Sequence, residues 1–243
     1  FNETKRMIER CTKLMQQTEN LQIKIPEASK DAFYGLVYYP AVAGMNLQLM
    51  SLHAALANWY AEYELSAANT YDALVKEEIE RDQKLTEYYN KEMAGGKWDG
   101  MMLSPHACFV TWNDEGWHYP ETKTICINTM SRMMVHAEND ESFVSEGMVN
   151  LPEFTEIGKE TYEIELANAG AVAYDFKVQA EQGICVSQPE GTVANDIVTL
   201  QVTIAKKESE SFERTLTIKA GNQKVDVKVR FKAAVNVPEG TFI

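Results

Sequence analysis

The side chains best suited to bind a metal ion, histidine and cysteine, are few in this chain and widely spaced. The four histidines and four cysteines form no HxxxH or CxxC pair. Structural zinc sites depend on such short spacings, because two ligands on one helix or turn act together. We therefore expect no metal ion, no cofactor, and buried thiols in place of disulfides. The residues concerned are His53, His106, His118, His136, Cys11, Cys108, Cys126 and Cys185.

Aromatic side chains gather between residues 98 and 120, among Asp, Asn, Gly and Pro. The segment has neither the period of a helix nor that of a strand, which favours a packed connector. Aromatic rings also stack on the apolar faces of sugars, so a carbohydrate platform is the alternative. The residues that would form it are Trp112, Trp117 and Tyr119.

His53 lies in a run without Lys, Arg, Asp or Glu between Asp31 and Glu62. The run is long enough to cross a bilayer of about 30 Å. Pro40 and Asn46 argue against that, because their polar groups would stay unpaired in lipid. We predict a central helix enclosed by other helices and kinked or restarted near Pro40. His53 is then a core residue bonded to a neighbouring carbonyl, with no chemical role.

Two amphipathic helices are predicted beside the central one. The first carries small or apolar residues at steps of three and four over residues 7–21. The second begins at a cap, either Ser66 or Asn69, and packs through an apolar stripe. Its charged pairs four residues apart contribute only about 0.2 to 0.5 kcal/mol each. The double glycine at 95–96 supplies the left-handed conformation that ends this helix.

Beyond about residue 121 the apolar period changes to two, the period of half-buried strands. Gly221-Asn222 lies between two such segments and predicts a hairpin turn. About seven to nine short strands favour an immunoglobulin-like antiparallel β-sandwich. The predicted fold is therefore α+β and multidomain: an N-terminal α-helical bundle (1–104), an aromatic connector (105–120) and the β-sandwich (121–243).

Composition restricts the partners of this chain. Its 243 residues, 45% hydrophobic and 24% charged, suffice for two modest cores. A formal net charge of −13 opposes attraction to nucleic acid or anionic lipid, since both carry the same sign. We expect neither partner. Residues 1–25 are amphipathic and differ from a secretion signal, so we expect a piece of a longer polypeptide that begins inside a helix.

One segment has the character of a family motif. Residues 88–98, Tyr-Tyr-Asn-Lys-Glu-Met-Ala-Gly-Gly-Lys-Trp, end a charged helix on the double glycine. With its neighbours, the segment resembles the region after the catalytic barrel in glycoside hydrolase family 115, the xylan α-1,2-glucuronidases. The likeness covers most of the chain, chiefly residues 33–112, and follows only the strand pattern after residue 155. It depends on Tyr39-Pro40, Asn46, Ala94-Gly95-Gly96-Lys97-Trp98, Met101-Met102, His106, Trp112 and Leu151-Pro152-Glu153-Phe154.

The resemblance implies an activity for the intact enzyme. Such enzymes hydrolyse, with inversion, the α-1,2 bond between xylan and glucuronic acid or its 4-O-methyl ether. Inversion needs two carboxyl groups about 6.5 to 9.5 Å apart. No acid pair stands out here, because the acids are expected on exposed faces, and the family's catalytic acids lie in an upstream barrel. We expect no catalytic residue in this chain. The implied partners are the catalytic barrel of the same polypeptide and glucuronoxylan. A second copy of the chain, in a homodimer, is a further option.

Two residues of the motif are candidate contacts to the substrate cleft. Trp98 and His106 could line the edge of the barrel's cleft, or they could fix their loop against the helices. Residues 103–105 and 107–109 depart from the family pattern, which has a more polar run before the histidine, and a glycine and aromatics after it. This departure weakens a family-specific role for His106.

Three functions are compatible with the sequence. The first is a non-catalytic C-terminal scaffold of a glucuronidase. The family suggests a secreted or periplasmic enzyme, and a cytoplasmic enzyme is the alternative. The second is a carbohydrate-binding module that contacts xylan through the aromatic loop or the sandwich. The third is an interaction domain whose likeness to the family is accidental. We favour the scaffold.

Overall fold

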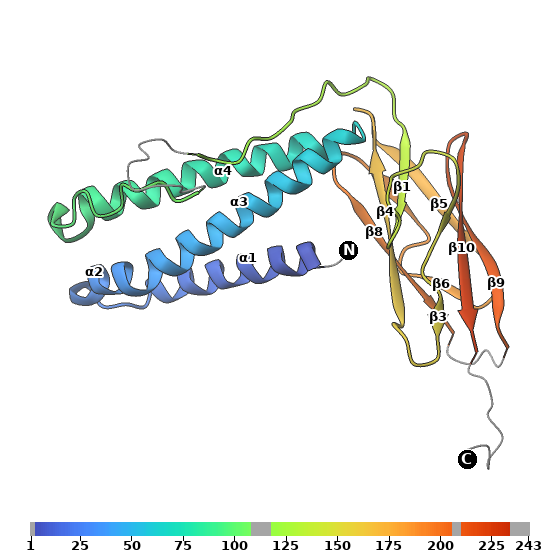
Figure 1. Cartoon of the computed structure of the whole chain (residues 1–243), viewed down its shortest axis with the longest axis horizontal. Coiled ribbons are helices and arrows are strands. Elements are labelled where there is room, and N and C mark those ends of the chain that lie inside the picture. The colour runs from blue at the N-terminus through green and yellow to red at the C-terminus, as the bar shows by residue number, and fades with distance from the viewer. Residues whose placement is uncertain (1–2, 108–117, 206–209, 234–243) are drawn as a thin grey trace, which may run out of the picture. The chain divides into compact units, whose positions relative to one another are not determined.

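The computed structural model of the chain is an α+β fold, with helices up to residue 96 and strands from residue 133 (Figure 1). Two compact units form. The helical unit comprises Phe1–Glu62 with Ala68–Thr124, and the strand unit comprises Tyr63–Ala67 with Ile125–Ile243. The structure describes residues 3–107, 118–205 and 210–233.

Three long helices dominate the helical unit, and α1 and α4 both run alongside α3 (Figure 1). Among the described residues, no helix combines the length and the low polarity needed to cross a membrane. The elements are α1 (Glu3–Gln22), η1 (Glu27–Ser29), α2 (Lys30–Phe33), η2 (Tyr34–Tyr38), α3 (Tyr39–Glu62), α4 (Ala67–Glu87), η3 (Tyr88–Glu92) and η4 (Met93–Gly96).

A π-helical turn precedes Pro40 at the start of α3. Proline has no N–H to donate, and its ring crowds the carbonyl four residues earlier. The η2 turn widens the backbone there, and the Tyr39 N–H donates to the Tyr34 carbonyl five residues back. The predicted central helix is confirmed, and its irregularity near Pro40 is a π turn.

α1 packs on α3 through one face only. Cys11, Met15 and Thr18 are buried, and the first two share a core with Val42 and Leu49 of α3. The other predicted face residues of α1, which fall seven apart, remain exposed: Met7, Leu14 and Leu21.

The buried face of α4 differs from the predicted apolar stripe. Leu74 and Ile79 are only half-buried, whereas several polar side chains are covered almost completely. The expectation that the acids lie on exposed faces was therefore wrong for three acids of this helix, whereas Glu77, Glu80 and Glu87 are exposed as expected. The buried polar residues of α4 are Asp72, Glu78, Asp82 and Thr86.

Within the described part of the strand unit, ten strands form two sheets that lie face to face (Figure 1). One sheet has the order β1-β4-β8-β6, and the other β2-β10-β9-β5-β7, with β3 also pairing with β10. The strands are β1 (Met133–Ala137), β2 (Gly147–Asn150), β3 (Phe154–Thr155), β4 (Thr161–Asn168), β5 (Tyr174–Ala180), β6 (Ile184–Val186), β7 (Glu190–Val193), β8 (Val198–Ile204), β9 (Phe212–Ala220) and β10 (Gln223–Lys232).

The second sheet is mixed, so the prediction of purely antiparallel pairing was wrong. β2 and β3 both run parallel to β10. Parallel pairing needs a long connection, and β4 to β9 supply it. The predicted Leu-Pro-x-Phe segment joins β2 to β3, and its Leu151 and Phe154 are buried.

The hairpin predicted at Gly221-Asn222 is confirmed. β9 and β10 pair antiparallel from Ala220 and Gln223 outward, and Gly221 has a φ of 55°. Alternate residues of both sheets point into one shared apolar core, which includes Phe176, Leu216 and Val227.

Candidate functional site

A buried carboxylate gathers the candidate residues of the helical unit. Asp82 of α4 is 0% exposed. Its Oδ1 lies 2.8 Å from His106 Nδ1, and its Oδ2 accepts a hydrogen bond of 2.9 Å from the Tyr119 hydroxyl. A carboxylate only accepts, so His106 Nδ1 carries a proton. The Tyr39 hydroxyl lies 3.4 Å from the other ring nitrogen, Nε2. We call Tyr39, Asp82, His106 and Tyr119 the Asp82 cluster.

The tyrosines of the Asp82 cluster are hydrogen-bond donors at neutral pH. Burial raises the pKa of Tyr39, and this outweighs the opposite effect of the neighbouring Thr86 hydroxyl. Burial also raises the pKa of Tyr119, and the neighbouring Asp82 raises it further. Neither phenol is therefore activated as a nucleophile. Both oxygens of Asp82 are occupied by donors from this chain, which suits a structural role better than proton transfer to a substrate.

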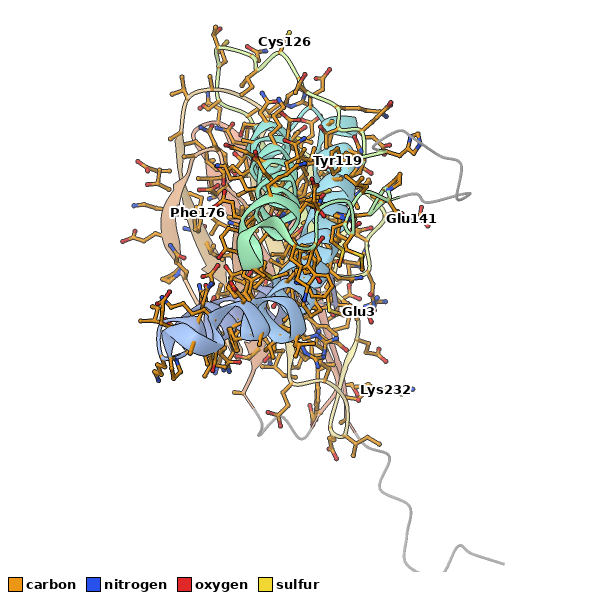
Figure 2. The ribbon with its side chains drawn as sticks, turned by 90° about the vertical axis from the view of Figure 1, so that its left-hand side faces the viewer. Glu3, Tyr119, Cys126, Glu141, Phe176 and Lys232 are labelled. Carbon is orange, nitrogen blue, oxygen red and sulfur yellow. The ribbon has the colours of Figure 1, made fainter. Side chains whose placement is uncertain are left out.

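Three elements position the Asp82 cluster. α3 presents Tyr39 just after the π turn, and α4 presents Asp82. The segment after η4 brings His106 and Tyr119 back onto these helices, and Tyr119 packs on the apolar cluster that contains Met50 of α3. Tyr119 is labelled in Figure 2.

The chain reversal after α4 depends on three residues with positive φ. Ala94, Gly95 and Gly96 have φ values of 53°, 65° and 78°, which confirms the predicted role of the double glycine. A Cβ at position 96 would lie 3.0 Å from the Lys91 carbonyl oxygen. The positive φ of Ala94 was not predicted, since alanine gives no signal for it.

Asn90 fixes the segment that follows. Its Oδ1 accepts from the Met102 N–H at 2.9 Å, and its Nδ2 donates to the Met102 carbonyl at 3.0 Å. Asn90 lies in η3, and Met102 lies in the loop after η4. Their contact holds the loop against the end of α4.

A second buried carboxylate joins α4 to α3. Glu78 Oε1 lies 2.7 Å from His53 Nδ1. The predicted backbone carbonyl partner of His53 was therefore wrong, because the Glu78 carboxylate faces inward and takes that place. Asn46 Nδ2 donates to the Glu78 carbonyl at 2.8 Å, and Arg81 donates to Asn46 Oδ1 at 3.3 Å. The α3–α4 contact is polar along much of its length.

Trp98 is a predicted site residue that is not part of the Asp82 cluster. Trp98 is 38% exposed, and the Lys97 ammonium lies 4.8 Å from the centre of its ring. Trp112 and Trp117 lie outside the described residues. Of the five candidates, the structure brings together His106 and Tyr119.

Sequence reasoning missed Glu78 and Asp82 as site residues. A signal was present, because Glu78, Asp82, Thr86 and Asn90 follow one another at steps of four. Such steps place all four on one face of a helix. A row of polar residues is also typical of an exposed face, and only their burial distinguishes the two cases.

The cysteines correct another expectation. Cys11 is buried, and burial raises the pKa of its thiol. Cys126, labelled in Figure 2, and Cys185 are free but exposed, contrary to the prediction of buried thiols. Among the residues that the structure describes, no group of three or more His, Cys, Asp or Glu side chains could hold a metal ion.

The chain matches no family model and no curated protein. Solved structures give weak likenesses. A CsuC–CsuE chaperone–adhesin complex of Acinetobacter baumannii is 12% identical over 34% of this chain and 53% of that one, with a TM-score of 0.29. The PapD-like domain 7 of human CEP192 is 9% identical over 49% and 96%, with a TM-score of 0.32. An MSP family member of C. elegans is 10% identical over 35% and 92%, with a TM-score of 0.28.

Proposed function

We propose that this chain is the non-catalytic C-terminal scaffold of a family 115-like α-glucuronidase, an enzyme that removes glucuronic acid or its 4-O-methyl ether from xylan. The scaffold packs against a catalytic barrel of the same polypeptide, and glucuronoxylan is the substrate of the whole enzyme. The chain alone is inactive.

An exposed apolar line on α1 carries the proposal. Met7, Leu14 and Leu21 are 37%, 48% and 49% exposed, and we call them the α1 stripe. Residues seven apart lie on one line of a helix, because seven residues make close to two turns. A contiguous exposed apolar surface is typical of an interaction site. The neighbouring face of α1, with Cys11 and Met15, packs on α3, so the α1 stripe lies beside this contact and is left for another domain.

The residues of the family resemblance support a structural role. Tyr39 and His106 bond within the Asp82 cluster, and Asn46 bonds to Glu78 and Arg81. A buried phenylalanine, Phe154, continues this pattern in the strand unit. All of them contribute to internal packing, which is what a scaffold requires.

Expressing the polypeptide encoded upstream of Phe1 tests the proposal. We expect a barrel that binds this chain, and a Leu14→Glu change that weakens binding at least tenfold because it buries a charge in the interface. Asn20→Glu, an exposed α1 change outside the α1 stripe, is the matched control. Release of methylglucuronic acid from glucuronoxylan by this chain alone would contradict the proposal, as would equal binding by both variants. If a second copy of this chain covers the α1 stripe instead of a barrel, the mass of the chain alone measured by light scattering should be that of a dimer.

The finer fold assignment is part of the same proposal. We infer a helical bundle followed by an immunoglobulin-like β-sandwich. The single core shared by two facing sheets supports the sandwich, and α1 and α4 alongside α3 support the bundle. An experimental structure whose strands connect in a different order would contradict it.

A carbohydrate-binding module is the second candidate function. A pocket of about 500 Å³ on the strand unit is lined by Phe154, Thr155, Lys159, Thr161 and Thr203, among others. The threonine hydroxyls and the carboxylates of Glu156 and Glu160, which also line it, suit hydrogen bonding to a sugar.

Affinity electrophoresis in glucuronoxylan tests this second function. Retardation that Thr203→Val abolishes would favour the pocket, whereas loss with Trp112→Ala and Trp117→Ala would favour the aromatic loop. Unchanged mobility of the parent chain would dismiss the module.

A further inference from the structure

A pocket of about 270 Å³ lies between α1, α3 and α4 of the helical unit. It is distinct from the Asp82 cluster and from the α1 stripe. Glu19 of α1, His53 of α3 and Glu77, Glu78 and Arg81 of α4 all line it. Pockets for drug-sized ligands measure about 300–1,000 Å³, so this one suits a smaller molecule.

The wall of this pocket contains an unmet hydrogen-bond acceptor. Glu78 is 4% exposed, and its Oε1 is paired with His53. Its Oε2 is buried and has no hydrogen-bond partner in the part of the chain that the structure describes. A buried carboxylate oxygen without a donor is costly and uncommon in native proteins. The position therefore calls for a donor from outside the chain.

The charges around the pocket select the kind of donor. Three carboxylates line it, from Glu19, Glu77 and Glu78, against one guanidinium, from Arg81. Arg81 directs one nitrogen to Asn46. A donor that carries positive charge is therefore favoured over a neutral one, since charge-assisted hydrogen bonds are the stronger. Because Oε2 is buried, a slim primary ammonium reaches it more readily than a planar guanidinium.

We propose that this pocket binds a small aliphatic primary ammonium, whose N–H donates to Glu78 Oε2 while Glu19 and Glu77 share its charge. The ligand class is that of short diamines. The site does not depend on the proposed scaffold function, because its lining comes entirely from the helical unit.

Calorimetric titration of the whole chain with 1,4-diaminobutane at 0.15 M salt tests the proposal. We expect saturable binding that Glu78→Gln weakens at least tenfold, because the amide keeps the size of the side chain but removes its charge. Glu87→Gln is the matched control: it makes the same change at an exposed position of α4 that does not line the pocket. 1,4-Butanediol, the neutral analogue, should not bind.

Three results would overturn the proposal: no saturable binding of the diamine, equal binding by the Glu78→Gln variant, or binding of the diol as tightly as the diamine. If that variant does not fold, the ring nitrogen shifts of His53 in the unaltered protein decide the matter. They should change saturably with diamine, and constant shifts would rule the site out.

Discussion

The two units of this protein bury different kinds of side chain. The strand unit encloses a large apolar core, with Leu200, Leu216 and Val227 all 0% exposed, and among the described residues it buries fewer polar side chains than the helical unit, chiefly His136, Glu138, Glu165 and Asn168. The helical unit also has apolar clusters, but α4 meets α3 through Asp82 and Glu78, which are 0% and 4% exposed. Apolar contacts are non-directional, whereas these hydrogen bonds require particular partners. The stability of the helical unit should thus depend on individual polar groups, and on pH, more than that of the strand unit.

The sequence offers a way to observe the helical unit alone. All four tryptophans lie at or before residue 117, and none belongs to the strand unit. Tryptophan fluorescence therefore reports the unfolding of the helical unit, and hydrogen exchange of the strand amides reports the unfolding of the strand unit.

The largest effect is expected in the apolar core. Phe176→Ala should destabilise the strand unit by about 4 kcal/mol, because a large buried side chain leaves a cavity. Hydrogen exchange across β5 and β9 measures the loss. Lys177→Ala, at the exposed neighbouring position, should cost no more than about 0.5 kcal/mol. Equal effects of the two changes would contradict the assigned core.

The second-largest effect on stability is expected when the Asp82 carboxylate is removed. Asp82→Ala removes the acceptor that the His106 ring and the Tyr119 hydroxyl share, at a cost of about 3 kcal/mol. Urea unfolding followed by tryptophan fluorescence gives the value. Glu80→Ala breaks only the exposed pair with Lys84, so the urea midpoint should change little. A loss below about 1 kcal/mol for Asp82→Ala would show that the polar contact matters little.

A smaller and more local effect is expected at the end of α4. Asn90→Ala removes two hydrogen bonds to the Met102 backbone and should cost about 1 to 2 kcal/mol. Faster hydrogen exchange at residues 101–107 should accompany it. Asn90→Asp keeps the acceptor and loses the donor, so an intermediate effect is expected. If aspartate and alanine behave alike, the acceptor contributes nothing.

The smallest effect concerns pH. Burial alone would raise the pKa of Asp72, but hydrogen bonds from Lys76 and Thr122 outweigh it and hold the pKa below its ordinary value. The ionised form therefore stabilises the fold above about pH 4, and this contribution is lost as the pH falls through the lowered pKa. Asp72→Asn should cost about 1 kcal/mol at pH 7 and nothing near pH 2.

A matched exposed acid sharpens that comparison. Asp99→Asn breaks a solvated pair with Lys91 and should change the urea midpoint little at either pH. A pH-independent difference for Asp72→Asn would contradict the proposed role of its ionised form.

Features that depend on neighbouring residues were predictable. The helical period of residues 7–21, the double glycine and the Gly221-Asn222 hairpin all follow from backbone geometry, and the structure contains each of them. The parallel pairing of β2 with β10 was not predictable, because the two strands are about seventy residues apart and no local turn fixes their direction.

The candidate site was predictable only in part. His106 and Tyr119 stood out by residue type and position, but their common partner Asp82 lies 24 and 37 residues away. An acid on a helix has the same local pattern whether it faces water or a histidine.

By itself, then, the sequence determined where the chain forms helices, turns and strands, because these follow from the steric limits of each residue and from the spacing of apolar side chains. Only the tertiary structure decided which face of α4 is buried and which donors meet Asp82 and Glu78. The physical reason is that burial and hydrogen-bond partners depend on how elements distant in sequence pack together, and a charged side chain is tolerated inside only where that packing supplies its partner.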